Sequence, residues 1–283
     1  ITLENKTNNN NKLIKLMFSQ LKNNINNIFS KDNTSINQKI LLYNHLYNSL
    51  PFNLNASIPI EFQENQLISF KNMILYGNRT LIELLFDDNN YLITFGALEH
   101  ETQSNRIIPH RKYFKEIVKF KNPLNITDTS LIERINQTLR MTYLRDTALG
   151  RVINENTNKA INLIIQMNHT EIIQFFINNT NYLKVLFSQM ESNDINVKKD
   201  AILFLSELVS CSKNVVQSRV TFNEVLCENG ILPILSKLIE DNSKDNNEIS
   251  NSISELININ IVEIFISILS SVPLLIRQYL IDN

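Results

Sequence analysis

Few residues of this chain have the types and spacing that catalysis requires. Two of the four histidines, His45 and His169, stand far from the other two, and no pair has the His-x-x-x-His spacing of a metal site on a helix. His100 lies between Glu99 and Glu101 and allows a metal site there, although lone surface or capping histidines are the interpretation we favour.

The other nucleophilic and phosphate-binding candidates are equally sparse. The only two cysteines, Cys211 and Cys227, lie in the apolar helical patterns LVSCSK and VLCENG, which predict packed thiols and not activated ones. The four glycines stand too far apart to form a loop that cradles a nucleotide. The sequence therefore predicts a protein that is not an enzyme and that has no cofactor and no metal ion.

One segment carries enough positive charge to bind a partner. The run RIIPHRKYFKEIVKFK, residues 106–121, contains six cationic side chains and one acidic one, with aromatic residues between them. It could bind an acidic or phosphorylated peptide through charge-assisted hydrogen bonds. A helix with a solvated basic face and buried aromatic residues is the alternative. The candidate partner-binding residues are Arg106, His110, Arg111, Lys112, Lys115, Lys119, Arg140 and Arg145.

The rest of the composition argues against broad classes of partner. The formal net charge is −1, so no global field attracts nucleic acid or an acidic membrane. The longest apolar tract, residues 259–276, is interrupted by Glu263 and Pro273 and predicts a buried helix of a repeat rather than a membrane span. The start of the chain has no apolar signal region, which favours an intracellular protein, and its first residue, Ile1, suggests a piece of a longer one.

The elements that must position these residues have helical periodicity throughout. In ILPILSKLIE the apolar residues recur at i, i+3, i+4, i+7 and i+8, from Ile231 to Ile239, so they share one helix face. A second helix is predicted to begin at Ser130, because Glu133 three residues later completes a capping box. Asn-rich clusters near 5–11, 23–37 and 242–251 are expected to be loops. The fold class is therefore all-α.

Two segments of the chain repeat one pattern. Residues 73–92, MILYGNRTLIELLFDDNNYL, and residues 163–183, LIIQMNHTEIIQFFINNTNYL, share an apolar helix end, Asn-x-Thr, an amphipathic helix and a polar break before Asn-Tyr-Leu. The spacing of 90 residues between Asn78 and Asn168 is about twice the length of an armadillo or HEAT unit. We predict one armadillo/HEAT-like α-solenoid over residues 1–283, with about six or seven repeats.

The stretch CENGILPILSKLIED, residues 227–241, specifies a turn between two of these helices. Gly230 can adopt the left-handed conformation that ends a helix, and Pro233 needs no backbone N–H in the first turn of the next. Armadillo repeats use the same Gly-x-Ile/Leu-Pro-x-Leu pattern.

The segment 97–149 resembles the core of the SMEK family, regulatory subunit 3 of protein phosphatase 4. The matching motifs are Leu98-Glu99-His100-Glu101, His110-Arg111-x-Tyr113, Lys119-Phe120-Lys121, Ile126-Thr127-Asp128 and the set Ile135, Gln137, Thr138, Arg140, Tyr143 and Asp146. His100 replaces the family's usual Tyr, so the chain is a diverged member.

The resemblance implies a non-catalytic scaffold that helps to assemble a phosphatase 4-like complex and brings substrates to it. The implied partners are the catalytic subunit, a further regulatory subunit and phosphoprotein substrates, with no nucleic acid and no membrane, in the nucleus and cytoplasm. We expect the family's N-terminal PH-superfold domain, which binds substrate peptides, to be absent from this chain. The alternative function is a generic armadillo-type adaptor that binds peptides or a small GTPase without a phosphatase.

Overall fold

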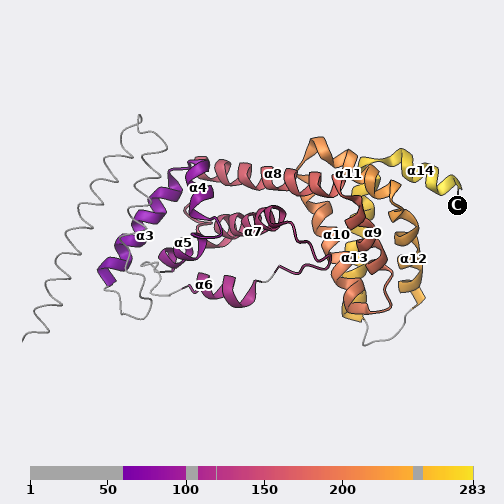
Figure 1. The fold of residues 1–283 in the computed structure, drawn as a ribbon, viewed down its shortest axis with the longest axis horizontal. Helices are drawn as coiled ribbons and strands as arrows, with labels where there is room; N and C mark the ends of the chain where they lie inside the picture. Colours follow the sequence, from indigo (N-terminus) through magenta and orange to yellow (C-terminus); the bar gives the residue numbers. More distant parts are fainter. Residues whose placement is uncertain (1–59, 100–107, 119, 245–250, 283) are drawn as a thin grey trace, which may run out of the picture. The chain divides into compact units, whose positions relative to one another are not determined.

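The computed structural model describes residues 60–99, 108–118, 120–244 and 251–282. Within these ranges the secondary structure is helical and includes no strand, which confirms the all-α class and is consistent with an α-solenoid (Figure 1). The elements are α3 (Ile60–Leu75), α4 (Arg79–Leu85), α5 (Tyr91–Leu98), α6 (His110–Lys112), the π-helix η1 (Tyr113–Ile117), α7 (Thr129–Tyr143), the π-helix η2 (Leu144–Ala148), α8 (Glu155–Asn178), α9 (Thr180–Met190), α10 (Ile195–Lys213), α11 (Val216–Glu228), α12 (Ile231–Lys244), α13 (Asn251–Ser271) and α14 (Pro273–Asp282).

Internal contacts divide the chain into two compact units. Unit 1 comprises residues 1–118 and 143–161, and unit 2 comprises residues 119–142 and 162–283. The boundaries at 142 and 161 lie inside α7 and α8 and not in loops. The single domain over 1–283 stays a prediction. Of the Asn-rich loops, 5–11 and most of 242–251 lie outside the described residues, as does the segment 23–37.

In unit 1, a tight turn joins α3 to α4. Gly77 has a φ of +72°, a left-handed conformation that favours glycine, and Asn78 follows as the N-cap of α4. The Asn78 side chain accepts a hydrogen bond of 3.0 Å from the backbone N–H of Leu81, which satisfies one of the free donors of the first turn. The sequence pattern thus ends one helix and begins another within three residues.

The start of α8 closes this turn from the other side. Asn154 donates to the carbonyl of Leu75 at 2.7 Å, and Thr157 donates to the carbonyl of Ile74 at 3.2 Å, so two terminal carbonyls of α3 gain partners. A Cβ on Gly77 would lie 3.1 Å from the backbone of Asn156. Gly77 therefore permits both the turn and the close approach of α8.

The polar break after α4 is a loop held by its own side chains. Asp87 accepts hydrogen bonds from the backbone N–H groups of Asn89 and Asn90, at 3.0 and 2.8 Å. These two hydrogen bonds close the loop between α4 and α5. Thr94 of α5 donates to the Leu85 carbonyl at 2.6 Å and fixes α5 against the end of α4.

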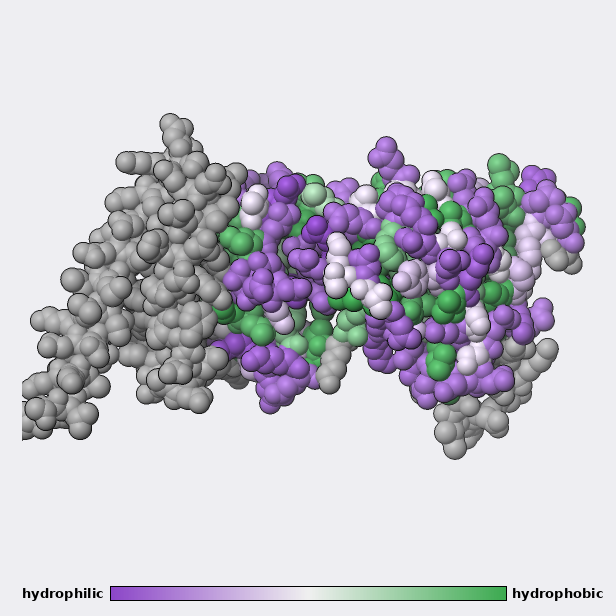
Figure 2. Space-filling view, viewed as in Figure 1, coloured by the Kyte–Doolittle hydropathy of each residue, from purple (hydrophilic) through white to green (hydrophobic). Residues whose placement is uncertain are grey.

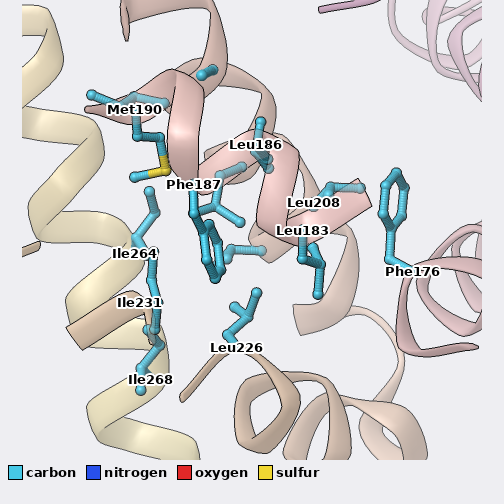
Figure 3. Packing of buried hydrophobic residues seen from close by; sticks show 14 of the residues in the cluster. Phe176, Leu183, Leu186, Phe187, Met190, Leu208, Leu226, Ile231, Ile264 and Ile268 are labelled. Carbon is cyan, nitrogen blue, oxygen red and sulfur yellow. The ribbon is translucent and has the colours of Figure 1, made fainter. Parts of the chain in front are cut away.

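Unit 2 has an extensive hydrophobic core to which every helix from α8 to α14 contributes. Figure 3 shows Phe187 of α9 next to Leu226 of α11, with Ile264 and Ile268 of α13 on the other side and Met190 above them. These five side chains are all at most 4% exposed. α13 packs mainly along α10 and also contacts α11, α12 and α14.

The turn between α11 and α12 has the predicted geometry. Gly230 has a φ of +88° and follows the last turn of α11, while Pro233 is the third residue of α12. Leu235 is 1% exposed, as expected for the apolar face of this helix. Ile239, the last residue of this apolar pattern, is 47% exposed, so the pattern extends past the buried part of the helix.

Two predicted helix starts also need correction. α7 begins at Thr129 and not at Ser130, because the Asp128 carboxylate accepts the Leu131 N–H at 2.9 Å and caps the helix earlier. In the second repeat copy, the predicted break at Asn168 is absent and no new helix starts there, because α8 continues from Glu155 to Asn178.

One described helix, over residues 253–271, is long and apolar enough to cross a membrane by length and composition alone. The core helix of a soluble protein meets the same criterion, and four isoleucines of α13 lie in the core of unit 2: Ile257, Ile261, Ile264 and Ile268. Elsewhere, Figure 2 shows hydrophilic residues over most of the visible described surface.

Candidate partner-binding site

Glu99, His110, Arg111, Tyr113 and Tyr143, which belong to the motifs that resemble the SMEK family, meet in unit 1. Glu99, at the end of α5, is only 4% exposed and accepts from Arg111 twice, at 2.7 Å from the backbone N–H and at 2.8 Å from Nε. A terminal guanidinium nitrogen of Arg111 donates to the same carboxylate. Two guanidinium nitrogens that donate to one carboxylate make a strong and directional ion pair. It attaches the start of α6 to the end of α5.

Aromatic rings complete the attachment. His110 is 1% exposed, and its Nδ1 lies 2.8 Å from the Tyr143 hydroxyl. Tyr143 also stacks on Tyr113, with ring centroids 4.7 Å apart, and meets Phe95 and Phe114 edge to face. Burial raises the pKa of Tyr143, and nearby Tyr113 and Glu99 raise it further. The helical turn from His110 to Ile117 is thus fixed on its inner side.

The structure separates the candidate binding residues into inner and outer groups. His110 and Arg111 belong to the inner cluster, and Arg140 of α7 is 5% exposed within unit 2. Lys112 and Lys115 of the same turn are exposed. Lys112 lies 3.8 Å from Glu116 in a pair whose side chains are 64% and 62% exposed. Such an exposed pair contributes little and leaves the ammonium groups accessible.

Of the remaining candidates, the structure describes Arg145. Arg145 of η2 pairs with its neighbour Asp146 at 2.6 Å, and this hydrogen bond lowers the pKa of the Asp146 carboxyl and raises that of Arg145. Arg106 and Lys119 lie outside the described residues, as do His100 and Glu101 of the possible metal site. The basic segment as a partner-binding surface stays a prediction.

Sequence reasoning missed a buried polar layer between α7 and α8 in unit 2. Asn168 is 2% exposed and donates to Gln137 at 3.0 Å, while Arg134 pairs with Glu171 at 2.6 Å at the edge. His169 is 7% exposed, and burial lowers its pKa. The prediction of surface or capping histidines is therefore wrong for His169 and for His110. The i, i+3 spacing of Arg134 and Gln137 on α7 was the available signal.

The two cysteines are packed side chains, as predicted. Burial raises the pKa of Cys211 to about 12 and that of Cys227 to about 11, with nearby glutamates adding to the effect. Very little thiolate is present at neutral pH, and the thiolate is the nucleophilic form.

Comparisons with known proteins agree with these motifs. A family model described as phosphatase 4 regulatory subunit 3 matches residues 67–283. Suppressor of Mek1 from Dictyostelium discoideum is 31% identical over 216 residues, which cover 75% of this chain and 20% of that protein. Serine/threonine-protein phosphatase 4 regulatory subunit 3 from Drosophila melanogaster is 26% identical over 220 residues, 76% of this chain and 21% of that protein.

The matched region is thus about a fifth of the length of these two relatives. No solved structure matches the chain with comparable significance.

Proposed function

Because the chain belongs to the phosphatase 4 regulatory subunit 3 family, we propose that it is a regulatory subunit of a phosphatase 4-like Ser/Thr phosphatase complex. In this proposal it contributes no catalytic group, helps to assemble the complex and brings phosphoprotein substrates to it. The match over residues 67–283 is the observation that carries the proposal. The name of the Drosophila relative, a regulatory subunit, supports the non-catalytic role.

The proposed partners are the catalytic subunit and a further regulatory subunit, in an armadillo/HEAT-like scaffold located in the nucleus and cytoplasm. The Gly230–Pro233 turn supports this type of repeat, since it has the geometry that two packed helices of such a repeat require.

The exposed outer side of the α6–η1 turn supports a binding role for the basic segment. Glu99 and the aromatic cluster hold the backbone of the turn, so Lys112 and Lys115 are presented from a fixed support. From such a support the two ammonium groups can donate hydrogen bonds to a carboxylate or phosphate of a partner with less loss of backbone freedom. Arg111 has a different role, because its guanidinium group already donates to the Glu99 carboxylate.

Affinity purification of the tagged chain from cells, followed by mass spectrometry, tests the function. We expect recovery of a phosphatase catalytic subunit. Recovery of other proteins without any phosphatase would instead support the generic adaptor. Fluorescence imaging of the same tagged chain tests its location, and exclusion from the nucleus would contradict the proposal.

A charge-reversal pair tests the proposed surface. Lys112→Glu with Lys115→Glu should weaken phosphatase or substrate binding and leave the melting temperature unchanged, because both side chains are exposed. Lys184→Glu with Lys213→Glu makes the same change of charge on exposed positions of α9 and α10 and should leave binding unchanged. If both pairs weakened binding equally, the change in net charge would explain the loss, and the α6–η1 surface would not.

A further inference from the structure

The outward face of α13 is apolar although no described helix covers it. Four side chains form this stripe: Ile259 is 53% exposed, Val262 51%, Ile266 56% and Leu269 43%. The opposite face of the same helix lies in the core, with Ile257, Ile261, Ile264 and Ile268 at most 1% exposed. Residues 259–276 were predicted to be buried, and the structure corrects this for one face.

The stripe has the spacing of a two-helix seam. Its members are separated by three, four and three residues, which is the a/d pattern of a heptad. A surface helix of a globular protein ordinarily carries polar residues on its outer face. Scattered exposed apolar residues need no explanation, but a continuous line of four along one helix marks a site of association.

Charge favours a protein partner over a lipid surface. α13 contains no Lys or Arg, and its exposed charged residues are Glu255 and Glu263. An anionic membrane would repel both carboxylates. At the other end of the helix, Arg219 of α11 donates to the Ser270 hydroxyl at 2.8 Å, so a positive charge lies beside the last turn of α13.

These opposite charges also select an orientation. In a parallel pair of identical helices each Glu255 would face another Glu255, which is unfavourable. In an antiparallel pair the Glu255 end of one helix faces the Arg219 end of the other. We propose that a second copy of this chain covers the stripe, with the two α13 helices antiparallel about a two-fold axis. Ile259 then packs on Leu269 of the second copy, and Val262 packs on Ile266 of the second copy.

Such a contact is isologous, since the same surface serves both copies. The stripe comes from exposed positions, so it can be altered without disturbing the core of unit 2. The proposal is independent of phosphatase binding, and its test needs only the purified chain.

Sedimentation analysis of the purified 283-residue chain gives the first test. We expect a dimer that Val262→Asp with Ile266→Asp converts to monomer, with the dissociation constant raised about a hundredfold or more, because the seam would bury unpaired charges. The matched control is Val185→Asp with Val197→Asp, at positions of α9 and α10 that are 48% and 39% exposed. The control should remain dimeric, and both pairs should keep the parent's helical circular dichroism spectrum, while only the monomeric pair should lose the part of the melting temperature that depends on protein concentration.

Cysteine cross-linking tests the orientation. A mixture of Ile259→Cys chains with Leu269→Cys chains should form a disulfide between the two variants, whereas either variant alone should not. The native thiols provide little background, because the pKa of Cys211 is about 12 and that of Cys227 about 11. Efficient cross-linking of each variant with itself would show a parallel pair and overturn the proposal.

The two glutamates should have opposite effects on the dissociation constant. Glu255→Gln should raise it a fewfold by removing the attraction to Arg219 of the second copy. Glu263→Gln should lower it, because the two Glu263 carboxylates lie on the same flank of the seam near the two-fold axis. The proposal would be overturned if the parent chain were monomeric at about 0.1 mM. At that concentration even a weak contact, with a dissociation constant of about 0.1 mM, would be substantially formed. Binding of that monomer to phosphatidylcholine vesicles would assign the stripe to a lipid surface instead.

Discussion

The two copies of the repeated pattern fold differently at their shared asparagine. In residues 73–92, the chain turns at Gly77, and Asn78 caps a new helix. In residues 163–183, Met167 replaces the glycine, α8 runs on without a break, and Asn168 becomes a buried donor to Gln137. The two copies thus differ both in the residue before the asparagine, glycine or methionine, and in the place of the asparagine, at a helix start or inside a helix.

The difference shows that a local motif does not fix its own role. The same Asn-x-Thr can supply a cap acceptor or a core donor, because an amide has both groups. The left-handed Gly77 turns the chain before Asn78, whereas the backbone before Asn168 stays helical through Met167. What the copies share lies further on, where Phe86 and Phe176 occupy matching positions and are both 0% exposed.

The largest expected effect is at this shared position. Phe86→Ala and Phe176→Ala should each lower the free energy of unfolding by about 3–5 kcal/mol, since each leaves a cavity in a packed core. Chemical denaturation monitored by circular dichroism measures both. A loss below 1 kcal/mol at one site only would show that the copies do not share this core position.

The asparagines separate the copies most clearly. Asn168→Asp should cost about 3 kcal/mol, because it buries a carboxylate and removes the donor to Gln137. Asn78→Asp is the matched control and should change the free energy of unfolding by less than about 0.5 kcal/mol, since aspartate is an equally good N-cap. Equal costs at both sites would contradict the different roles given to the two amides.

Gly77→Ala should cost about 1–2 kcal/mol, because alanine is strained at the left-handed φ of +72°. The new Cβ would also press on the start of α8. Met167→Ala, at a position that is 37% exposed within α8, should have almost no effect on the melting temperature. Tolerance of alanine at Gly77 would show that this turn does not require a left-handed residue.

The smallest effect concerns pH. Position 169 is a buried histidine in the second copy, and the matching position in the first copy is Arg79, which is 43% exposed. Burial lowers the pKa of His169 from its ordinary value of 6.5, so the unfolded chain binds the proton more tightly than the folded chain. This contribution to stability is complete above pH 6.5 and decreases as the pH falls from there towards the folded-state pKa.

Denaturation midpoints measured between pH 8 and pH 5 would reveal the effect. His169→Gln should remove the part of the pH dependence that begins near 6.5. An unchanged profile in that variant would show that His169 does not titrate differently in the folded and unfolded chain.

Local signals in the sequence predicted the fold best. The Gly230 turn, the buried Leu235 and the Asp87 loop all depend on residues within a few positions of one another. The start of α7 was missed by one residue because Asp128, just before the predicted cap, competes for the same N–H groups.

The candidate site was less predictable because it depends on contacts between distant residues. Counting charges along 106–121 could not show that Arg111 is held by Glu99 twelve residues earlier, or that His110 lies against Tyr143. Among the candidate residues that the structure describes, Lys112 and Lys115 are the exposed ones, and the binding surface stays a prediction.

The most direct test of the regulatory role is reconstitution with a phosphatase 4 catalytic subunit. The purified chain, mixed with that subunit and a second regulatory subunit, is predicted to elute with them in one complex on size-exclusion chromatography. Full-length Drosophila phosphatase 4 regulatory subunit 3 serves as the positive control. If that control forms a complex and this chain elutes alone under the same conditions, the regulatory role proposed for it is wrong.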